Sequence, residues 1–257
     1  MTVHWLARGL DAVPAGESWL SAGERERLAA MRFAKRRTEF LVSRFAAKLT
    51  IAGALDRPTD DLTTLAGIEI RRKPTGAPAA FVDGQPAELA MSQTDRADWA
   101  VCVVRRDPHV ALGCDLELVE PRSPGFVQDY LTEREQATIA ASSDADLLAN
   151  LLWSAKESAL KVLETGLRRD TRSVEVSLGA DGDGADGSSV AKGSGGWHPL
   201  EVRPVEGGVF PGWWQRWGAF LLTVVSSAPT GPPEPVEPRA QLAAAVPSHR
   251  WMEHLGD

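Results

Sequence analysis

The sequence predicts a mixed α+β fold, and three observations carry this prediction. Apolar segments of strand length lie at residues 99–104, 110–119 and 174–178. Two capping boxes, Ser21–Glu24 and Thr132–Glu135, place a hydroxyl residue three positions before a glutamate, the pattern that opens a helix. A longer amphipathic run extends from about Asp146 to Glu164. Strands and helices interleaved in this way are typical of an α+β domain.

Composition limits the classes of function. The chain has 257 residues, enough for one large domain or two small ones. The net charge of −7 argues against general nucleic-acid binding, and no apolar run approaches the roughly 20 residues of a membrane span. The five histidines are scattered, which argues against a histidine-based metal site. Cys102 and Cys114 are typical of small buried residues in a reducing compartment, and no signal-peptide pattern is visible. We therefore expect a cytoplasmic monomer.

In chain order, residues 3–7 predict a first strand, and the helix that Ser21 opens should run through Met31. A second helix contains residues 40–49. Residues 68–70 predict a strand, followed by a rigid basic loop.

The second helix carries a basic side. Arg37, Arg44 and Lys48 fall near one face, at spacings of seven and four residues. This side is either a solvated face or a cationic wall for phosphates.

The middle of the chain predicts a hairpin and two helices. The strands at 99–104 and 110–119 are joined by a short turn, so they should pair antiparallel. A helix covers residues 136–141, and Gly166 is expected to cap the longer helix that follows. The expected remainder is a strand at 174–178, a flexible loop at 179–196, closing strands near 213–217 and 219–225, a Pro-rich tail at 229–257, and a short helix within 239–257.

Two acidic patterns carry the chemistry. Asp115 and Glu117 lie two apart in a predicted strand, so they share one face. Trp153, Glu157 and Lys161 recur every four residues and share one helix face. Either pattern alone fits a solvated surface, but close carboxylates also suit a hard divalent cation, and the cation favours phosphate chemistry.

The segments GCDLE at 113–117 and WSAKESALK at 153–161 resemble the two signature motifs of the 4′-phosphopantetheinyl transferases, GxDxE and WxxKEx₃K, at the usual separation of roughly 40 residues. The pair is specific, whereas each motif alone is less so. Further segments resemble the larger, two-lobed Sfp-type class of the family: Leu20–Arg25, residues 44–48, the loop at 73–78 and the region around Ser92.

The resemblance implies a reaction and its residues. Coenzyme A would donate its phosphopantetheine arm to a serine of an apo acyl or peptidyl carrier protein. Asp115, Glu117 and Glu157 would hold Mg²⁺, or alternatively Mn²⁺, with Glu157 also a candidate general base and Lys161 neutralising phosphate charge. The expected CoA-binding residues are Arg44, Lys48, Lys73, Ser92, Gln93, Asp115, Lys156 and Lys161.

Two departures from the family pattern concern CoA binding. The family usually has Ser-His where this chain has Ser92 and Gln93, and Gly-Lys-Pro where this chain has Ala77 between Gly76 and Pro78. Gln retains a neutral donor but no charge. We therefore expect a higher KM for CoA than is usual in the family.

The architecture that the resemblance implies is two similar α/β lobes related by pseudo-two-fold symmetry, at residues 1–108 and 109–228, with the site between them. The repeated capping boxes are consistent with it. Two alternatives stay open: a non-catalytic paralogue that binds carrier proteins, and a Mg²⁺-dependent nucleotide pyrophosphate hydrolase. The carrier and the pathway are not indicated, although the larger class leans towards secondary metabolism.

Overall fold

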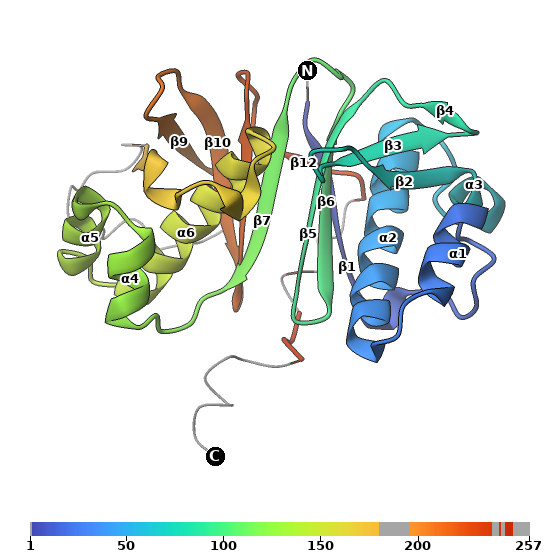
Figure 1. Cartoon of the computed structure of the whole chain (residues 1–257), viewed down its shortest axis with the longest axis horizontal. Coiled ribbons are helices and arrows are strands. Elements are labelled where there is room, and N and C mark those ends of the chain that lie inside the picture. The colour runs from blue at the N-terminus through green and yellow to red at the C-terminus, as the bar shows by residue number, and fades with distance from the viewer. Residues whose placement is uncertain (1, 180–195, 238–241, 243–244, 249–257) are drawn as a thin grey trace.

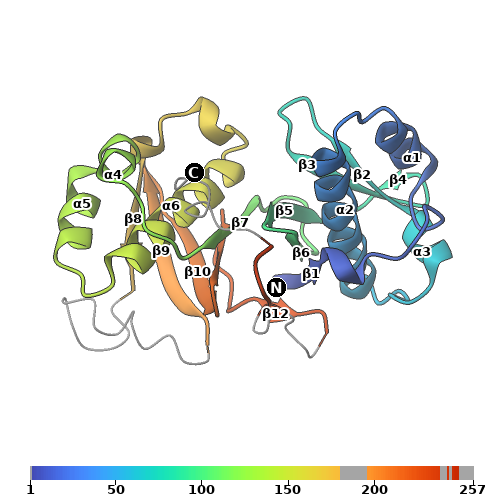
Figure 2. The ribbon, with the colours of Figure 1, turned by 90° about the horizontal axis from the view of Figure 1, so that it is seen from below.

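The computed structural model describes residues 2–179, 196–237, 242 and 245–248. Two sheets stand side by side at the centre, and the long helices α2 and α6 lie in front of them (Figure 1). Seen from below, α1–α3 and α4–α6 form separate groups on either side of the central strands (Figure 2). The expected loop at 179–196 and the helix within 239–257 lie almost entirely outside the described residues.

The first sheet has the strand order β12-β1-β6-β5. Its strands are β1 (His4–Gly9), β5 (Ala90–Arg96), β6 (Trp99–Arg105) and β12 (Glu234–Pro235). β6 pairs antiparallel with β1 and β5, and β12 pairs parallel with β1. The β5–β6 hairpin turns through Ala97 and Asp98, whose φ angles of 49° and 65° match the strand twist.

The second sheet has the order β7-β11-β10-β9-β8 and is antiparallel throughout. Its strands are β7 (Leu112–Leu118), β8 (Val174–Leu178), β9 (His198–Pro204), β10 (Phe210–Trp217) and β11 (Phe220–Ser226). A small third sheet contains β2 (Ile68–Arg72), β3 (Pro78–Val82) and β4 (Gln85–Pro86).

The predicted hairpin between residues 99–104 and 110–119 is wrong. β6 and β7 belong to different sheets, and β6 instead pairs with β5. The connection between them carries the chain from one sheet to the other, and the predicted boundary at 108/109 falls within it. The boundary itself stays a prediction.

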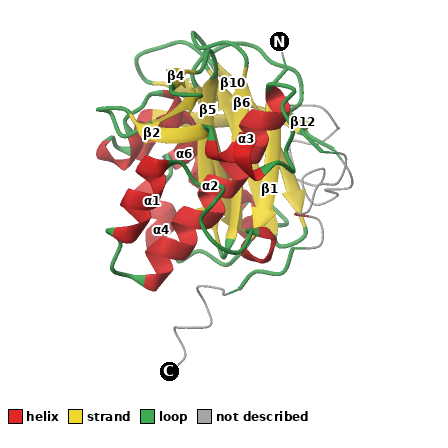
Figure 3. Ribbon diagram, turned by 90° about the vertical axis from the view of Figure 1, so that its right-hand side faces the viewer, coloured by secondary structure: helices red, strands yellow, loops and turns green. Residues whose placement is uncertain are grey.

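The α-helices are α1 (Ala22–Ala29), α2 (Ala34–Ala54), α3 (Leu62–Ala66), α4 (Pro124–Tyr130), α5 (Glu133–Ala140) and α6 (Ala145–Val162), and 3-10 turns lie at η1 (Leu10–Ala12), η2 (Gly166–Arg168) and η3 (Thr171–Ser173). α2 packs on β1 and β6, and α6 packs on β7 and β11, which gives a helical layer over a strand layer (Figure 3). No helix in the described part of the chain has the length and apolar character needed to cross a membrane.

Burial follows strand alternation in β7. Cys114, Leu116 and Leu118 are buried in a core shared with strands of the first sheet, as the period of two predicts. The intervening Asp115 and Glu117 therefore face α6. Separate apolar cores lie beneath α2 and α6.

Side chains of β5 join the two sheets at their edges. The Ser92 hydroxyl accepts the backbone N–H of Cys114 at 3.1 Å, and the Thr94 hydroxyl accepts that of Leu116 at 3.4 Å. β5 and β7 thus lie side by side although they form no backbone ladder in the described structure. This seam brings residues of β5 to the acidic strand.

The capping box at Ser21 is confirmed, and its glutamate does more than close the helix end. Glu24 is buried and also accepts the backbone N–H of Ile70 at 3.1 Å. Lys48 of α2 lies 2.7 Å from the same carboxylate. Glu24 therefore ties α1, α2 and β2 together.

The second capping box is also confirmed, and the same arrangement recurs around it. Glu135 is buried, accepts the backbone N–H of Val176 at 2.9 Å, and lies 2.8 Å from Lys156 of α6. A glutamate, a helix lysine and a strand backbone thus meet in the same way in both halves of the chain.

The Pro-rich tail has a role in the fold. Its residues 234–235 form β12, which extends the first sheet next to β1. Glu237 pairs with Arg8 at 2.6 Å. Val236 packs so closely on Gly53 of α2 that a Cβ atom there would lie 2.0 Å from a Val236 methyl carbon. The segment through residue 237 therefore returns to the first half of the chain.

Candidate active site

The acidic strand and the motif helix meet directly. Trp153 Nε1 donates to Glu117 Oε1 at 3.0 Å, and Lys161 Nζ donates to Asp115 Oδ1 at 2.9 Å and to the Cys114 carbonyl at 2.8 Å. Glu157 lies between Trp153 and Lys161 on the same helix face. The predicted juxtaposition of the two motifs is therefore present, and Lys161 pairs with the strand.

Hydroxyl groups hold Asp115 in place. Thr94 donates to Asp115 Oδ1 at 3.2 Å, and Ser154 donates to the Asp115 carbonyl at 3.2 Å. The hydroxyls of Ser154 and Ser158 each lie 2.8 Å from that of Thr223 on β11. These buried polar contacts fix α6 against β7 and β11.

Glu117 lies near two arginines that the sequence did not single out. Its Oε2 is 3.2 Å from Arg122 and 3.5 Å from Arg96. Arg122 is itself oriented by a 2.7 Å bond to Asn150 on α6. Arg96 ends β5, which lies beside β7, and this neighbourhood brings it to Glu117. The sequence patterns did not predict that β5 and β7 are neighbours, so Arg96 was not found from them.

Burial dominates the protonation of the site. It raises the pKa of Glu157 to about 7, and the negative charge of Asp115 adds to this shift while Lys161 opposes it. Burial likewise raises the pKa of Glu117, with Asp115 adding and Arg96 opposing. For Lys161, burial lowers the pKa, but the charge of Asp115, the hydrogen bond to it and the charge of Glu157 together act more strongly with the other raising contributions, and the net pKa lies above the ordinary value.

Asp115 leaves an acceptor for a cation. Its Oδ2 is buried without a hydrogen-bond partner in the described structure, whereas the buried Glu117 Oε2 is engaged by its ion pairs with Arg122 and Arg96. A buried carboxylate oxygen without a donor, close to further carboxyl groups, fits a hard divalent cation. No three His, Cys, Asp or Glu side chains among the described residues are already arranged around one metal position. The predicted set of Asp115, Glu117 and Glu157 therefore stays a prediction.

Two of the expected CoA-binding residues do not face a surface in this structure. Lys48 and Lys156 are fully buried, and each pairs with a capping-box glutamate. The remaining donors go to backbone carbonyls, those of Leu65 and Ile68 for Lys48 and those of Thr171 and Val174 for Lys156. With three donors engaged, neither ammonium can reach a phosphate.

Arg44 is also turned inward. It is 4% exposed, its Nε is 3.4 Å from Glu24, and its guanidinium lies 4.7 Å from the centre of the Phe40 ring. Burial lowers its pKa to about 10. The basic side of α2 is therefore neither a solvated face nor a cationic wall, because Arg44 and Lys48 face α1, and Arg37 donates to the Leu28 carbonyl at 2.6 Å.

The other expected CoA residues differ in accessibility. Ser92 is buried in the seam between β5 and β7. Gln93 is half-buried, and its Oε1 is buried without a hydrogen-bond partner in the described structure. Lys73 is 47% exposed and pairs with Glu164 at 2.6 Å. Gln93 and Lys73 remain available for a ligand.

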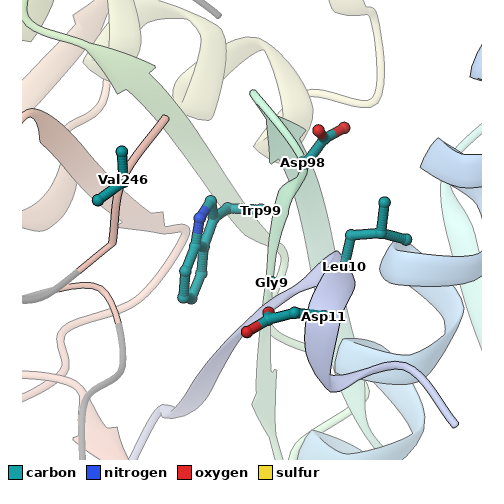
Figure 4. Close-up of a pocket in the computed structure, with 6 residues that line it drawn as sticks. All are labelled: Gly9, Leu10, Asp11, Asp98, Trp99 and Val246. Atoms are coloured by element: carbon teal, nitrogen blue, oxygen red, sulfur yellow. The ribbon is translucent and has the colours of Figure 1, made fainter. Parts of the chain in front are cut away.

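A surface depression lies elsewhere on the molecule. It has a volume of about 540 Å³ and is lined by Gly9, Leu10, Asp11, Asp98, Trp99 and Val246 (Figure 4). It contains none of the motif residues.

Comparison with known proteins bears on the second half of the chain. Residues 111–191 match the family model described as the 4′-phosphopantetheinyl transferase superfamily. The matched segment contains Asp115, Glu117, Glu157 and Lys161. No curated protein matches the chain.

Proposed function

We propose that this protein transfers the 4′-phosphopantetheine arm of coenzyme A to a serine of an apo acyl or peptidyl carrier protein. The observation that carries the proposal is the pairing of Lys161 with Asp115 at 2.9 Å, which joins the two motifs inside the segment matching the transferase superfamily. The transfer forms a bond from the serine oxygen to phosphorus and breaks the bond to adenosine 3′,5′-bisphosphate, the leaving group.

Glu157 is the proposed general base. Its pKa of about 7 lets the carboxylate form and the acid form interchange near neutral pH, which suits acceptance of the serine proton. Its place between Trp153 and Lys161 sets it over the acidic strand.

Lys161 is proposed to neutralise charge on the phosphates. Two of its three N–H groups donate to β7, and the side chain is 29% exposed. In the described contacts, the third N–H group therefore remains for a ligand oxygen. A divalent cation, Mg²⁺ or alternatively Mn²⁺, held by Asp115 and Glu117 with Glu157 as a further ligand, would supply additional charge neutralisation.

We also propose that the chain is a duplicated, two-lobed protein of the Sfp-type class. The support is the repeated contact of a capping-box glutamate with a buried helix lysine, at Glu24 and Lys48 and again at Glu135 and Lys156. One such contact could arise for local reasons, but two with the same helix, strand and backbone partners favour duplication.

One experiment tests the function against both alternatives. The protein is incubated with CoA, Mg²⁺ and an apo carrier protein, and the carrier is weighed by mass spectrometry. A gain of one phosphopantetheine arm is expected. Carrier binding without a mass gain would indicate the non-catalytic paralogue, and CoA cleavage without a carrier adduct would indicate the hydrolase.

A further inference from the structure

A loop of the first half of the chain is fastened to the end of α6. Lys73 Nζ donates to Glu164 Oε1 at 2.6 Å, and Thr75 Oγ1 donates to Glu164 Oε2 at 2.8 Å. Arg168 joins the same two residues, because its guanidinium donates to the Thr75 carbonyl at 3.2 Å and to the Glu164 carbonyl at 3.1 Å. Both carboxylate oxygens of Glu164 are thus used by the loop between β2 and β3.

Glu164 holds this position in an unfavourable backbone conformation. α6 ends at Val162, and Glu164 has φ of 54°, a left-handed conformation that glycine adopts more easily. Gly166, which we expected to cap the helix, comes two residues later and begins η2. A strained non-glycine residue is maintained where its surroundings require it, and here both side-chain oxygens are bound.

The contact is a poor source of fold stability. Lys73 and Glu164 are 47% and 31% exposed, and exposed ion pairs contribute little because water and salt screen them. A glycine at this position would relieve the strain. The carboxylate therefore has a use other than stabilising the chain.

The position of Glu164 suggests that use. It follows the last turn of α6, and its backbone N–H donates to the Lys161 carbonyl at 3.0 Å. The bond to Glu164 takes one donor of Lys73, and the ammonium remains exposed enough to meet a ligand. The contact thus brings a second ammonium, from the other half of the chain, to the end of the helix that carries Lys161.

We propose that Glu164 is a positioning residue, which latches the 73–77 loop onto α6 and holds the Lys73 ammonium beside Lys161 to receive a phosphate of the donor. The proposal rests on the transferase function for the identity of that donor. The latch itself is a property of the free protein.

The latch is tested first without any substrate. The amines of the protein are acylated under limiting reagent, and labelling is measured at each lysine by mass spectrometry. We expect Glu164→Gln and Glu164→Gly to raise labelling of Lys73 about two- to fivefold, as the loss of an exposed ion pair allows. Lys35, 77% exposed, serves as the internal reference. Glu175→Gln, which breaks the exposed pair with Arg134, is the matched control and should leave Lys73 unchanged.

The two variants separate charge from strain. Glu164→Gly relieves the left-handed strain and Glu164→Gln does not. If both variants raise the labelling of Lys73 equally, the loss of the carboxylate is the cause. Unchanged labelling in both variants would overturn the latch.

The positioning role is tested by kinetics. Glu164→Gln should raise KM for CoA about two- to fivefold, with kcat and KM for the carrier unchanged, and Glu164→Asp should restore part of the affinity. Greater Lys73 labelling with an unchanged KM for CoA would overturn the positioning role. If the wild-type protein transfers nothing, the proposed function fails, and the labelling comparison still decides whether the latch exists.

Discussion

Gly113 and Ser158 are in backbone contact. A Cβ atom on Gly113 would lie 1.8 Å from the Ser158 carbonyl oxygen, so no other residue fits between β7 and α6 at this point. The glycine of the strand motif therefore sets the distance between the acidic strand and the helix of the second motif. That distance decides whether Lys161 reaches Asp115.

The first prediction follows from this contact. Gly113→Ala should push α6 away from β7, lowering the free energy of unfolding by about 2–4 kcal/mol and reducing transfer strongly. Urea unfolding and the carrier mass assay measure the two effects. Gly125→Ala in α4 is the control, because the nearest atom to its Cβ would be Ser123 Oγ at 4.0 Å; it should be neutral or slightly stabilising. Wild-type stability in Gly113→Ala would contradict the steric argument.

The second prediction concerns Glu157. Glu157→Gln should abolish transfer and leave the fold intact, because an amide cannot accept the serine proton. Circular dichroism checks the fold and the carrier mass assay checks the transfer. Full activity in this variant would remove Glu157 from the mechanism.

The third prediction uses the pKa of the same residue. Because burial raises the pKa of Glu157 from 4.5 to about 7, the folded protein binds this proton more tightly than the unfolded chain. The metal-free protein should therefore lose stability as pH rises from about 4.5 to about 7, by roughly 2–3 kcal/mol from this group. Urea unfolding at several pH values in EDTA measures the slope.

Glu157→Gln should flatten that slope without removing it, since burial also raises the pKa of Glu117. A slope that is the same in wild type and variant would show that Glu157 titrates normally.

The fourth prediction concerns Gln93. Gln93→His should lower KM for CoA several-fold below pH 6.5, where imidazole gains a charge, and have less effect above it. The half-buried position on β5 leaves the side chain accessible. Transfer rates measured over a range of CoA concentrations at two pH values give the change in KM. No gain in affinity at either pH would refute the view that the missing histidine weakens CoA binding.

Periodicity alone could predict the two motif faces. Asp115 and Glu117 share a strand face, and Trp153 and Lys161 share a helix face, because each spacing fixes a direction within one element. The structure adds that these faces meet. Local rules also located both capping boxes, since they depend only on residues three apart.

Long-range packing is what the sequence could not supply. Spacing placed Lys48 on one side of its helix but could not show that Glu24 and β2 cover that side. Arg96 was missed because β5 joins β7 through hydroxyl groups, which leave no pattern of paired strands. β12 was missed because a Pro-rich segment resembles a tail until its partner strand is known.

The last prediction separates a structural from a CoA-binding role for the buried lysines. Lys156→Met leaves Glu135 buried without its counter-charge, and should lower the free energy of unfolding by about 3–5 kcal/mol. Lys48→Met should cost less, because Arg44 remains 3.4 Å from Glu24. Urea unfolding compares the two variants. The double variant of Glu135→Gln with Lys156→Met should be less destabilised than the sum of the single changes, because the pair is lost together. KM for CoA, measured where Lys156→Met is still folded, should equal that of the wild type; a stable Lys156→Met protein with weak CoA binding would instead return Lys156 to the ligand site.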